Sequence, residues 1–174
     1  MKYHMYKNEI LRKICKIQTD ADLIEVRSLI TSEDQEHGGV LRPIDSDKLR
    51  KITLAGGSVW VARDHEHEIV SCFTCEEIVG STGTWVYLNN GIVRPDLRHA
   101  GGMCMKQTIA TAMAKLGYDQ NYIVIYLGRS IFQELGYQEV SIITLSDLDH
   151  KIGKVIGKKL RPESEPHIFI HLGH

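Results

Sequence analysis

The fold of this chain is decided by the stretch Ile92-Val93-Arg94-Pro95-Asp96-Leu97-Arg98-His99-Ala100-Gly101-Gly102-Met103. Pro95 ends a predicted strand, because proline has no N–H to donate to a ladder, and a helix is expected directly afterwards. The first turn of a helix has unpaired N–H groups and partial positive charge, and glycine lets a ligand approach the backbone. The turn therefore predicts a site for phosphate oxygens, to which Arg98 adds a charge. A glycine turn that serves only the backbone conformation is the alternative.

Upstream of this turn, the pattern predicts two helices followed by three strands. The helices are expected from Thr19 or Asp20, with Leu23, Val26 and Ile30 inward, and from Asp45 or Ser46 to Gly56-Gly57, with Leu49 and Ile52 inward. The strands are expected over Ser58–Arg63, Glu68–Ile78 and Thr84–Val93. Gly91 has no side chain to pack, which predicts a bulge or a close backbone approach late in the third strand. Ile10–Ile17 fits either a strand or a helix start.

Downstream of the turn, helices and strands alternate. A helix is predicted over about Gly101–Leu116, with an apolar stripe of Met105, Ile109, Ala112, Met113 and Leu116. Next come a strand buried on both faces (Tyr122–Leu127), a short helix (Ser130–Leu135) and another strand (Tyr137–Leu145). A polar and basic segment (Asp147–Arg161) and a last strand (His167–Leu172) complete the chain. Gly153 and Gly157 weaken a helix prediction for the basic segment.

The composition is that of an ordinary folded protein. The chain has 174 residues, 43% of them hydrophobic and 25% charged, which predicts one domain over residues 1–174 without disorder or a membrane span. The 21 basic and 22 acidic residues nearly balance, so no nucleic acid partner is expected. Residues 1–17 lack the apolar core of a secretory signal, and the four cysteines are expected to be reduced thiols. A cytoplasmic location is therefore predicted.

Two groups of side chains have the residue types of a metal or redox site. Cys72 and Cys75 have the spacing of such sites, but residues three apart on a strand point to opposite faces. The histidines at positions 65, 67, 167 and 171 have no carboxylate pattern beside them. No metal is expected, and buried thiols and ordinary histidines are the favoured interpretations.

The order of these elements, with the loop after the third strand, resembles the GNAT superfamily of acyl-CoA-dependent N-acyltransferases. The family's loop is Arg or Gln, two residues, Gly, one residue, then Gly or Ala, after a strand that ends in Val-x-Pro. This chain has Val93-Arg94-Pro95 and then Arg98-His99-Ala100-Gly101-Gly102, with Met103 in place of the last small residue. A later signature, a short helix ending in Leu-Gly-Phe or Leu-Gly-Tyr, is similar to Ile131–Tyr137. The likeness extends from about Thr19 to Leu172.

The resemblance implies an α/β fold of the mixed, α+β type. A central mixed, largely antiparallel sheet with a splayed strand pair would be flanked by helices. It also implies acetyl-CoA as cosubstrate, with the pantetheine arm against the bulged strand, the pyrophosphate at the helix start and a later loop near the thioester. The residues that it assigns to this site are Ile92, Val93, Arg98, His99, Ala100, Gly101, Gly102, Met103, Cys104, Gly128 and Arg129.

The catalytic residues stay unassigned. Family members often have an acidic residue on the bulged strand and a tyrosine in the short helix, and this chain has Asn89 and Asn90 on the strand and Phe132 in the helix. Neither asparagine nor phenylalanine can exchange a proton at neutral pH. Tyr126, Tyr87, Glu76 and Glu77 are the possible substitutes, and the sequence does not choose among them.

Three functions are compatible with these residues. The first hypothesis is an N-acetyltransferase that moves an acetyl group from acetyl-CoA to a primary amine of a small molecule or a protein. The second is a catalytically weak member of the fold that binds an acyl-CoA as a sensor or partner module. The third is an unrelated α/β domain whose Gly101-Gly102 turn binds another phosphate ligand, such as a nucleotide. A homodimer formed through the C-terminal strands is a further possibility from the family.

Overall fold

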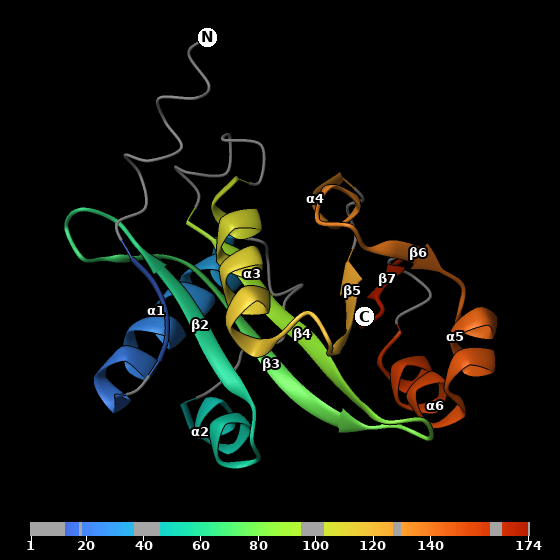
Figure 1. Ribbon diagram of the computed structural model, residues 1–174. Helices are drawn as coiled ribbons and strands as arrows, with labels where there is room; N and C mark the ends of the chain where they lie inside the picture. The colour runs from blue at the N-terminus through green and yellow to red at the C-terminus, as the bar shows by residue number, and fades with distance from the viewer. Residues whose placement is uncertain are drawn as a thin grey trace, which may run out of the picture.

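The computed structural model describes residues 13–17, 19–36, 46–94, 103–126, 130–160 and 165–173. Its strands form one sheet in the order β1-β2-β3-β4-β5-β7-β6 (Figure 1). β4 and β5 are parallel and the other neighbours are antiparallel, so the predicted mixed, largely antiparallel sheet is confirmed. The strands are β1 (Lys13–Lys16), β2 (Ser58–Arg63), β3 (Ile69–Val79), β4 (Thr84–Val93), β5 (Asn121–Tyr126), β6 (Gln138–Val140) and β7 (His167–His171).

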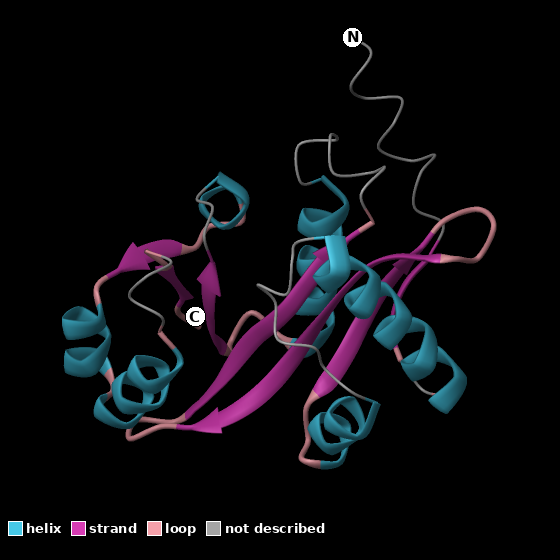
Figure 2. Ribbon diagram, turned by 180° about the vertical axis from the view of Figure 1, so that it is seen from behind, coloured by secondary structure: helices cyan, strands magenta, loops and turns pink. Residues whose placement is uncertain are grey.

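Helices cover both faces of the sheet. They are α1 (Asp20–Glu36), α2 (Ser46–Leu54), α3 (Met103–Leu116), α4 (Ser130–Glu134), α5 (Ile142–Leu148) and α6 (His150–Lys159). α3 lies on one face, and α1–α2 and α5–α6 lie at the two ends of the opposite face (Figures 1 and 2). Within the described ranges, none of these helices has both the length and the apolar character that crossing a bilayer requires.

Side-chain alternation along the strands divides the interior into three apolar cores. On β3, Phe73 and Cys75 belong to the core under α3 and α4, whereas Cys72 belongs to the core under α1 and α2. On β4, Trp85 and Tyr87 belong to the core under α5 and α6. Successive strand residues point to opposite faces, and β3 is buried continuously from Ile69 to Cys75 because helices cover both of its faces there.

The cap predicted for α1 and the inward faces predicted for α1 and α2 are confirmed. The Thr19 hydroxyl accepts a hydrogen bond from the Asp22 N–H at 3.2 Å, which caps the start of α1. Leu23, Val26 and Ile30 are buried on the inner face of α1, and Leu49 and Ile52 are buried on that of α2. The residues of α1 and α2 that the spacing placed inward therefore form the core against β2 and β3.

The prediction of one strand over Tyr137–Leu145 is wrong. Only Gln138–Val140 is a strand, and the chain then turns into α5. The Ser141 hydroxyl accepts from the Thr144 N–H at 3.1 Å, which caps this helix. The β-branched residues just after the cap resemble a strand in composition, but Leu145 is the buried residue of the helix.

The basic segment after α5 forms a second helix, α6, in spite of its glycines. A Cβ at Gly153 would lie 2.2 Å from Oγ of Ser146, so a larger residue at that position would push α6 away from α5. Gly153 is buried in this contact. Its cost in helix propensity is therefore offset by close packing of the two helices.

Asp149, between α5 and α6, fixes the β3–β4 hairpin to these helices. Its carboxylate accepts hydrogen bonds from the N–H groups of Ser81 (2.8 Å), Thr82 (3.0 Å) and Ile152 (3.1 Å), and from Nε1 of Trp85 (3.3 Å). Burial alone would raise the pKa of Asp149, but the hydrogen bonds from Ser81, Ile152 and Thr82 outweigh it and hold the pKa well below its usual range. The side chain is therefore a carboxylate that caps α6 and closes the hairpin turn.

Asp149→Ala should lower the free energy of unfolding by about 3 kcal/mol, because several buried donors lose their acceptor. Urea denaturation measures this, with the exposed Asp147→Ala as the control. A lowered pKa stabilises the fold fully above the unfolded value of about 3.9 and loses its contribution as the pH falls from there. The gap between wild type and Asp149→Ala should therefore be constant from pH 7 to pH 5 and shrink below about pH 4. An equal loss in both variants would contradict this role.

Candidate functional site

The sheet opens between its two parallel strands. β4 and β5 pair from Trp85 with Asn121 to Leu88 with Val124, and no further. β4 continues to Val93 and β5 continues to Tyr126. The splayed strand pair implied by the resemblance is therefore present, and the opening begins just after Leu88.

A bulge in β4 accompanies the opening. Thr74 of β3 pairs with Asn89 and Cys72 pairs with Ile92, so β4 has one residue more than β3 between these pairs. The extra residue lies at Asn90-Gly91, and Asn90 has a φ of 54°. A bulge at Gly91 was predicted, but the residue in the left-handed conformation is Asn90. Because a bulge bends its strand and increases the twist, it directs the end of β4 away from β5.

The asparagine side chains stabilise the bulge. Oδ1 of Asn89 accepts from the N–H of Asn90 at 2.8 Å, and Nδ2 of Asn90 donates to the Thr74 hydroxyl at 3.0 Å. That hydroxyl donates to the backbone oxygen of Asn89 at 3.1 Å. These contacts account for two asparagines where the family often has an acid: here the side chains hold the backbone in shape.

The start of α3 lies over the bulge. A Cβ at Gly91 would lie 3.4 Å from Cε of Met105, in the first turns of α3, which is an ordinary contact with the end of a side chain. Cys104 is buried in that first turn, and its backbone oxygen accepts from the Thr108 hydroxyl at 2.6 Å. The opening between β4 and β5 and the N-terminus of α3 are therefore neighbouring features.

The structure describes only part of the predicted cofactor site. Ile92 and Val93 are the last residues of β4, and Met103 and Cys104 are the first residues of α3. Arg98, His99, Ala100, Gly101, Gly102, Gly128 and Arg129 lie outside the described residues. The loop that contains the glycine pair nevertheless has both ends fixed, one at the bulged strand and one at the helix start.

The possible catalytic side chains lie on different faces. Glu76 pairs with Tyr87 across β3 and β4, on the face that carries α5 and α6. Tyr126 lies on the α3 face at the end of β5, with its ring edge-on to Phe132 and the centroids 5.2 Å apart. Phe132 is itself buried and stacked on Phe169, so it is a core residue.

The phenol of Tyr87 is held in its protonated form. Burial, and then the nearby charge of Glu76, raise the pKa of Tyr87 to about 12. Nζ of Lys159 lies 5.0 Å from the centre of the same ring. At neutral pH this tyrosine therefore cannot act as a base.

The cysteine pair faces two different cores. Cys72 lies under α1 and α2 and Cys75 lies under α3, as strand alternation requires. Burial raises the pKa of each thiol to about 12. A shared metal or a disulfide between these two side chains is therefore ruled out by their directions.

The histidines are not brought together. His65 and His67 lie in the β2–β3 turn, whereas His167 and His171 lie on β7, with β4 and β5 between them. Nδ1 of His167 lies 2.6 Å from a carboxylate oxygen of Glu139. In the described part of the chain, no three His, Cys, Asp or Glu side chains are grouped as metal ligands.

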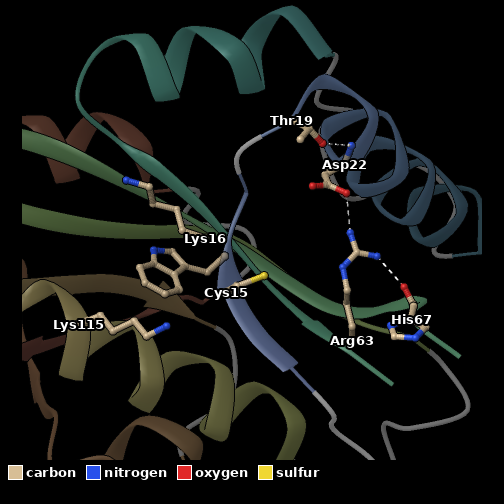
Figure 3. Close-up of a pocket in the computed structure, with 8 residues that line it drawn as sticks. Cys15, Lys16, Thr19, Asp22, Arg63, His67 and Lys115 are labelled. Atoms are coloured by element: carbon tan, nitrogen blue, oxygen red, sulfur yellow. Dashed lines mark hydrogen bonds and ion pairs between the residues drawn. The ribbon is translucent and has the colours of Figure 1, made fainter. Parts of the chain in front are cut away.

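A separate hollow of about 700 Å³ lies at the β1 edge of the sheet (Figure 3). No residue pattern in the sequence predicts this hollow. Its Arg63 bonds Asp22 at 2.7 Å and the backbone oxygen of His67 at 2.6 Å, so the guanidinium is already engaged within the fold. Strands β2 and β3 lie between this hollow and β4. It is therefore distinct from the opening described above.

No protein-family model matches the sequence, and no curated protein matches it. Solved structures do. The chain is similar to N-acetylglutamate synthase from Neisseria gonorrhoeae, complexed with coenzyme A and N-acetyl-glutamate, with a TM-score of 0.67 and 16% identity over 94% of this chain and 36% of that one. This chain therefore spans about a third of the length of the Neisseria protein.

Two other similar structures are close to this chain in length. A GNAT family acetyltransferase from Staphylococcus aureus has a TM-score of 0.55 and 14% identity over 91% of this chain and 98% of that one. A GNAT family N-acetyltransferase from Escherichia coli, in complex with CoA, has a TM-score of 0.57 and 12% identity over 74% and 69%. The chain therefore has the GNAT fold, and the resemblance found in the sequence is confirmed for the fold.

Asn90→Val should lower the free energy of unfolding by about 2 kcal/mol, because a β-branched residue is strained at positive φ and the bond to Thr74 is lost. Asn90→Gly loses the same bond but accepts the backbone angle, so it should cost about 1 kcal/mol or less. Thermal and urea denaturation of both variants measure the difference. Equal losses would show that the left-handed conformation does not limit stability.

Proposed function

We propose that this chain is an N-acetyltransferase that moves an acetyl group from acetyl-CoA to a primary amine of a small molecule or a protein. The observation that carries the proposal is the end of β4–β5 pairing at Leu88, together with the packing of the first turns of α3 on the same strand at Gly91. An open strand edge can pair with an extended ligand, and a helix start can bind a diphosphate. The two features together fit the arm and the pyrophosphate of coenzyme A.

Each part of the site has a role in this proposal. Backbone groups of Ile92 and Val93 pair with the pantetheine arm, and the N–H groups from His99 to Cys104 bind the pyrophosphate with Arg98. Gly128 and Arg129, which follow β5 in the sequence, are proposed to contact the thioester end of the arm. Gly91 is exposed and has no side chain, which supports access of the ligand to the backbone of the bulge.

Acetyl-CoA supplies the activated acetyl group, and the chain must position it, polarise its carbonyl and move one proton. Positioning and a backbone donor to the carbonyl oxygen need no ionisable side chain. Efficient proton transfer needs an ionisable side chain, because a positioned acid or base contributes roughly 10²–10⁴ in rate. Neither Phe132, which is buried in the core, nor the two asparagines of the bulge can fill this role.

A sensor or partner module that binds an acyl-CoA without fast transfer is the second candidate. The observation in its favour is that Asn89 and Asn90 are used to hold the bulge, where the resemblance leads one to expect an acid. A homodimer through the C-terminal strands and a cytoplasmic location, which the four free cysteines suit, stay predictions of this proposal.

Acetyl-CoA and CoA should each raise the melting temperature of the protein, and ATP should not, because a ligand that binds only the folded state stabilises it.

Arg98→Ala should weaken CoA binding by about tenfold or more through the loss of a charge-assisted hydrogen bond. The exposed Arg27→Ala on α1 is the matched control and should bind CoA like the wild type. Calorimetric titration with CoA measures both affinities, and equal affinities would remove Arg98 from the site.

Release of free thiol from acetyl-CoA in the presence of primary amines separates the two candidates. An N-acetyltransferase should release CoA only when an amine is present, in proportion to the amide formed. A protein that binds acetyl-CoA and shows no amine-dependent release would be the sensor.

A further inference from the structure

The sheet face opposite α3 has a polar band between two apolar cores. Along β3 the residues Cys72, Thr74, Glu76 and Ile78 share this face, because strand residues two apart point the same way. Cys72 lies in the core of α1 and α2, and Ile78 packs against the core of α5 and α6. Thr74 and Glu76 lie between these cores and belong to neither. The two helix pairs lie at opposite ends of this face of the sheet (Figure 2). Thr74 is buried and bonded to the bulge, and Glu76 is half-buried, so Glu76 is the member of this band that reaches solvent.

This band reaches the opening between β4 and β5. Thr74 pairs with Asn89, and Glu76 pairs with Tyr87, one residue before the last β4–β5 pair at Leu88. A donor that is bound at the start of α3 lies on the other face of the sheet. A group bound in the band and a donor bound at α3 can therefore meet only where the two strands separate.

Glu76 is the acidic side chain of the band. It is half-buried, and its charge is close enough to the phenol of Tyr87 to help raise the pKa of that phenol. Within the described ranges, no ion pair or hydrogen bond engages its carboxylate, whereas Asp22 bonds Arg63 and Asp149 caps α6. The fold therefore leaves this carboxylate available beside the opening.

The other candidates fit this position less well. Glu77 is exposed and, as the next residue along β3, points to the opposite face. Tyr87 is held as a neutral phenol, and Tyr126 lies with Phe132 on the α3 side. Of the four residues that the sequence left open, Glu76 is the one placed to contact a group that enters from the face opposite α3.

We propose that Glu76 binds the amino group of the acceptor and accepts its proton, which also makes positively charged primary amines the preferred acceptors. This inference rests on the proposed function. The bound ammonium first gives one proton to the Glu76 carboxylate, so that the neutral amine nitrogen can attack the thioester carbonyl carbon. The C–N bond forms as the C–S bond breaks, the nitrogen loses its second proton to the departing thiolate of CoA, and Glu76 then returns its proton to water.

Glu76→Gln, with Glu77→Gln as the matched control, tests this role. Amine-dependent thiol release is measured with putrescine, phenylethylamine, glucosamine and a lysine-containing peptide. For any amine that the wild type acetylates, Glu76→Gln should lower kcat/KM by roughly 10²–10⁴, and Glu77→Gln should leave it unchanged. Glu76→Asp keeps the charge and should recover part of the loss. Melting temperatures without ligand check that all variants fold.

A binding measurement separates this role from a structural one. In the presence of CoA, the amine that the wild type acetylates should raise the melting temperatures of wild type and Glu77→Gln but not that of Glu76→Gln. All three should bind CoA alike. Wild-type rates in Glu76→Gln would overturn the assignment of Glu76 and leave the proposed function intact. Acetyl-CoA binding by the wild type without turnover of any amine would overturn the proposed function, and with it this inference.

Discussion

Strands β4 and β5 share four residue pairs and then separate at Leu88 and Val124. Parallel strands normally continue to pair while both are extended, so their separation has a cause, and the bulge at Asn90-Gly91 supplies it. The bulge is held by side-chain hydrogen bonds from Asn89 and Asn90. Polar backbone that faces an opening in a sheet must be satisfied by water or by a ligand, and this requirement makes the opening a candidate binding site.

The fold is stable in spite of this opening, because helices pack on both faces of the sheet around it. α3 packs over the bulge, and α1–α2 and α5–α6 cover the two ends of the opposite face. Asp149 connects the α5–α6 pair to the β3–β4 hairpin, at the end of β4 that remains paired with β5. The strands are therefore held firmly at one end and separated at the other. The helix pairs that bury the two ends of the sheet also leave the polar band in which Glu76 lies.

Sequence patterns predicted the elements whose burial follows a simple period. β2 and β4 have the predicted bounds, and α1, α2 and α3 bury the predicted faces. The helix α5 was missed, because Ile142 and Ile143 suggest a strand and the cap at Ser141 depends on a turn that composition does not specify. Gly91 indicated the bulge, but the left-handed residue is Asn90, since its amide can bond Thr74.

The residues proposed to bind acetyl-CoA follow from a loop motif, and the structure describes only the end of β4 before that loop and the start of α3 after it. Glu76 could not be chosen from sequence. Strand alternation predicts the face of β3 on which the Glu76 side chain lies. The gap between the two apolar cores, however, depends on where α1–α2 and α5–α6 pack on that face, and no local sequence pattern predicts this. Close packing of α6 on α5 at Gly153 is a tertiary effect of the same kind.

Hydrogen–deuterium exchange with and without CoA tests the central claim most directly, because it reports on each backbone segment separately. If the β4–β5 opening and the start of α3 bind the coenzyme, CoA should slow exchange from Ile92 to Cys104 and leave the β1 edge unchanged. Protection confined to the hollow at Arg63 and Asp22, or none between Ile92 and Cys104 at saturating CoA, would contradict the account.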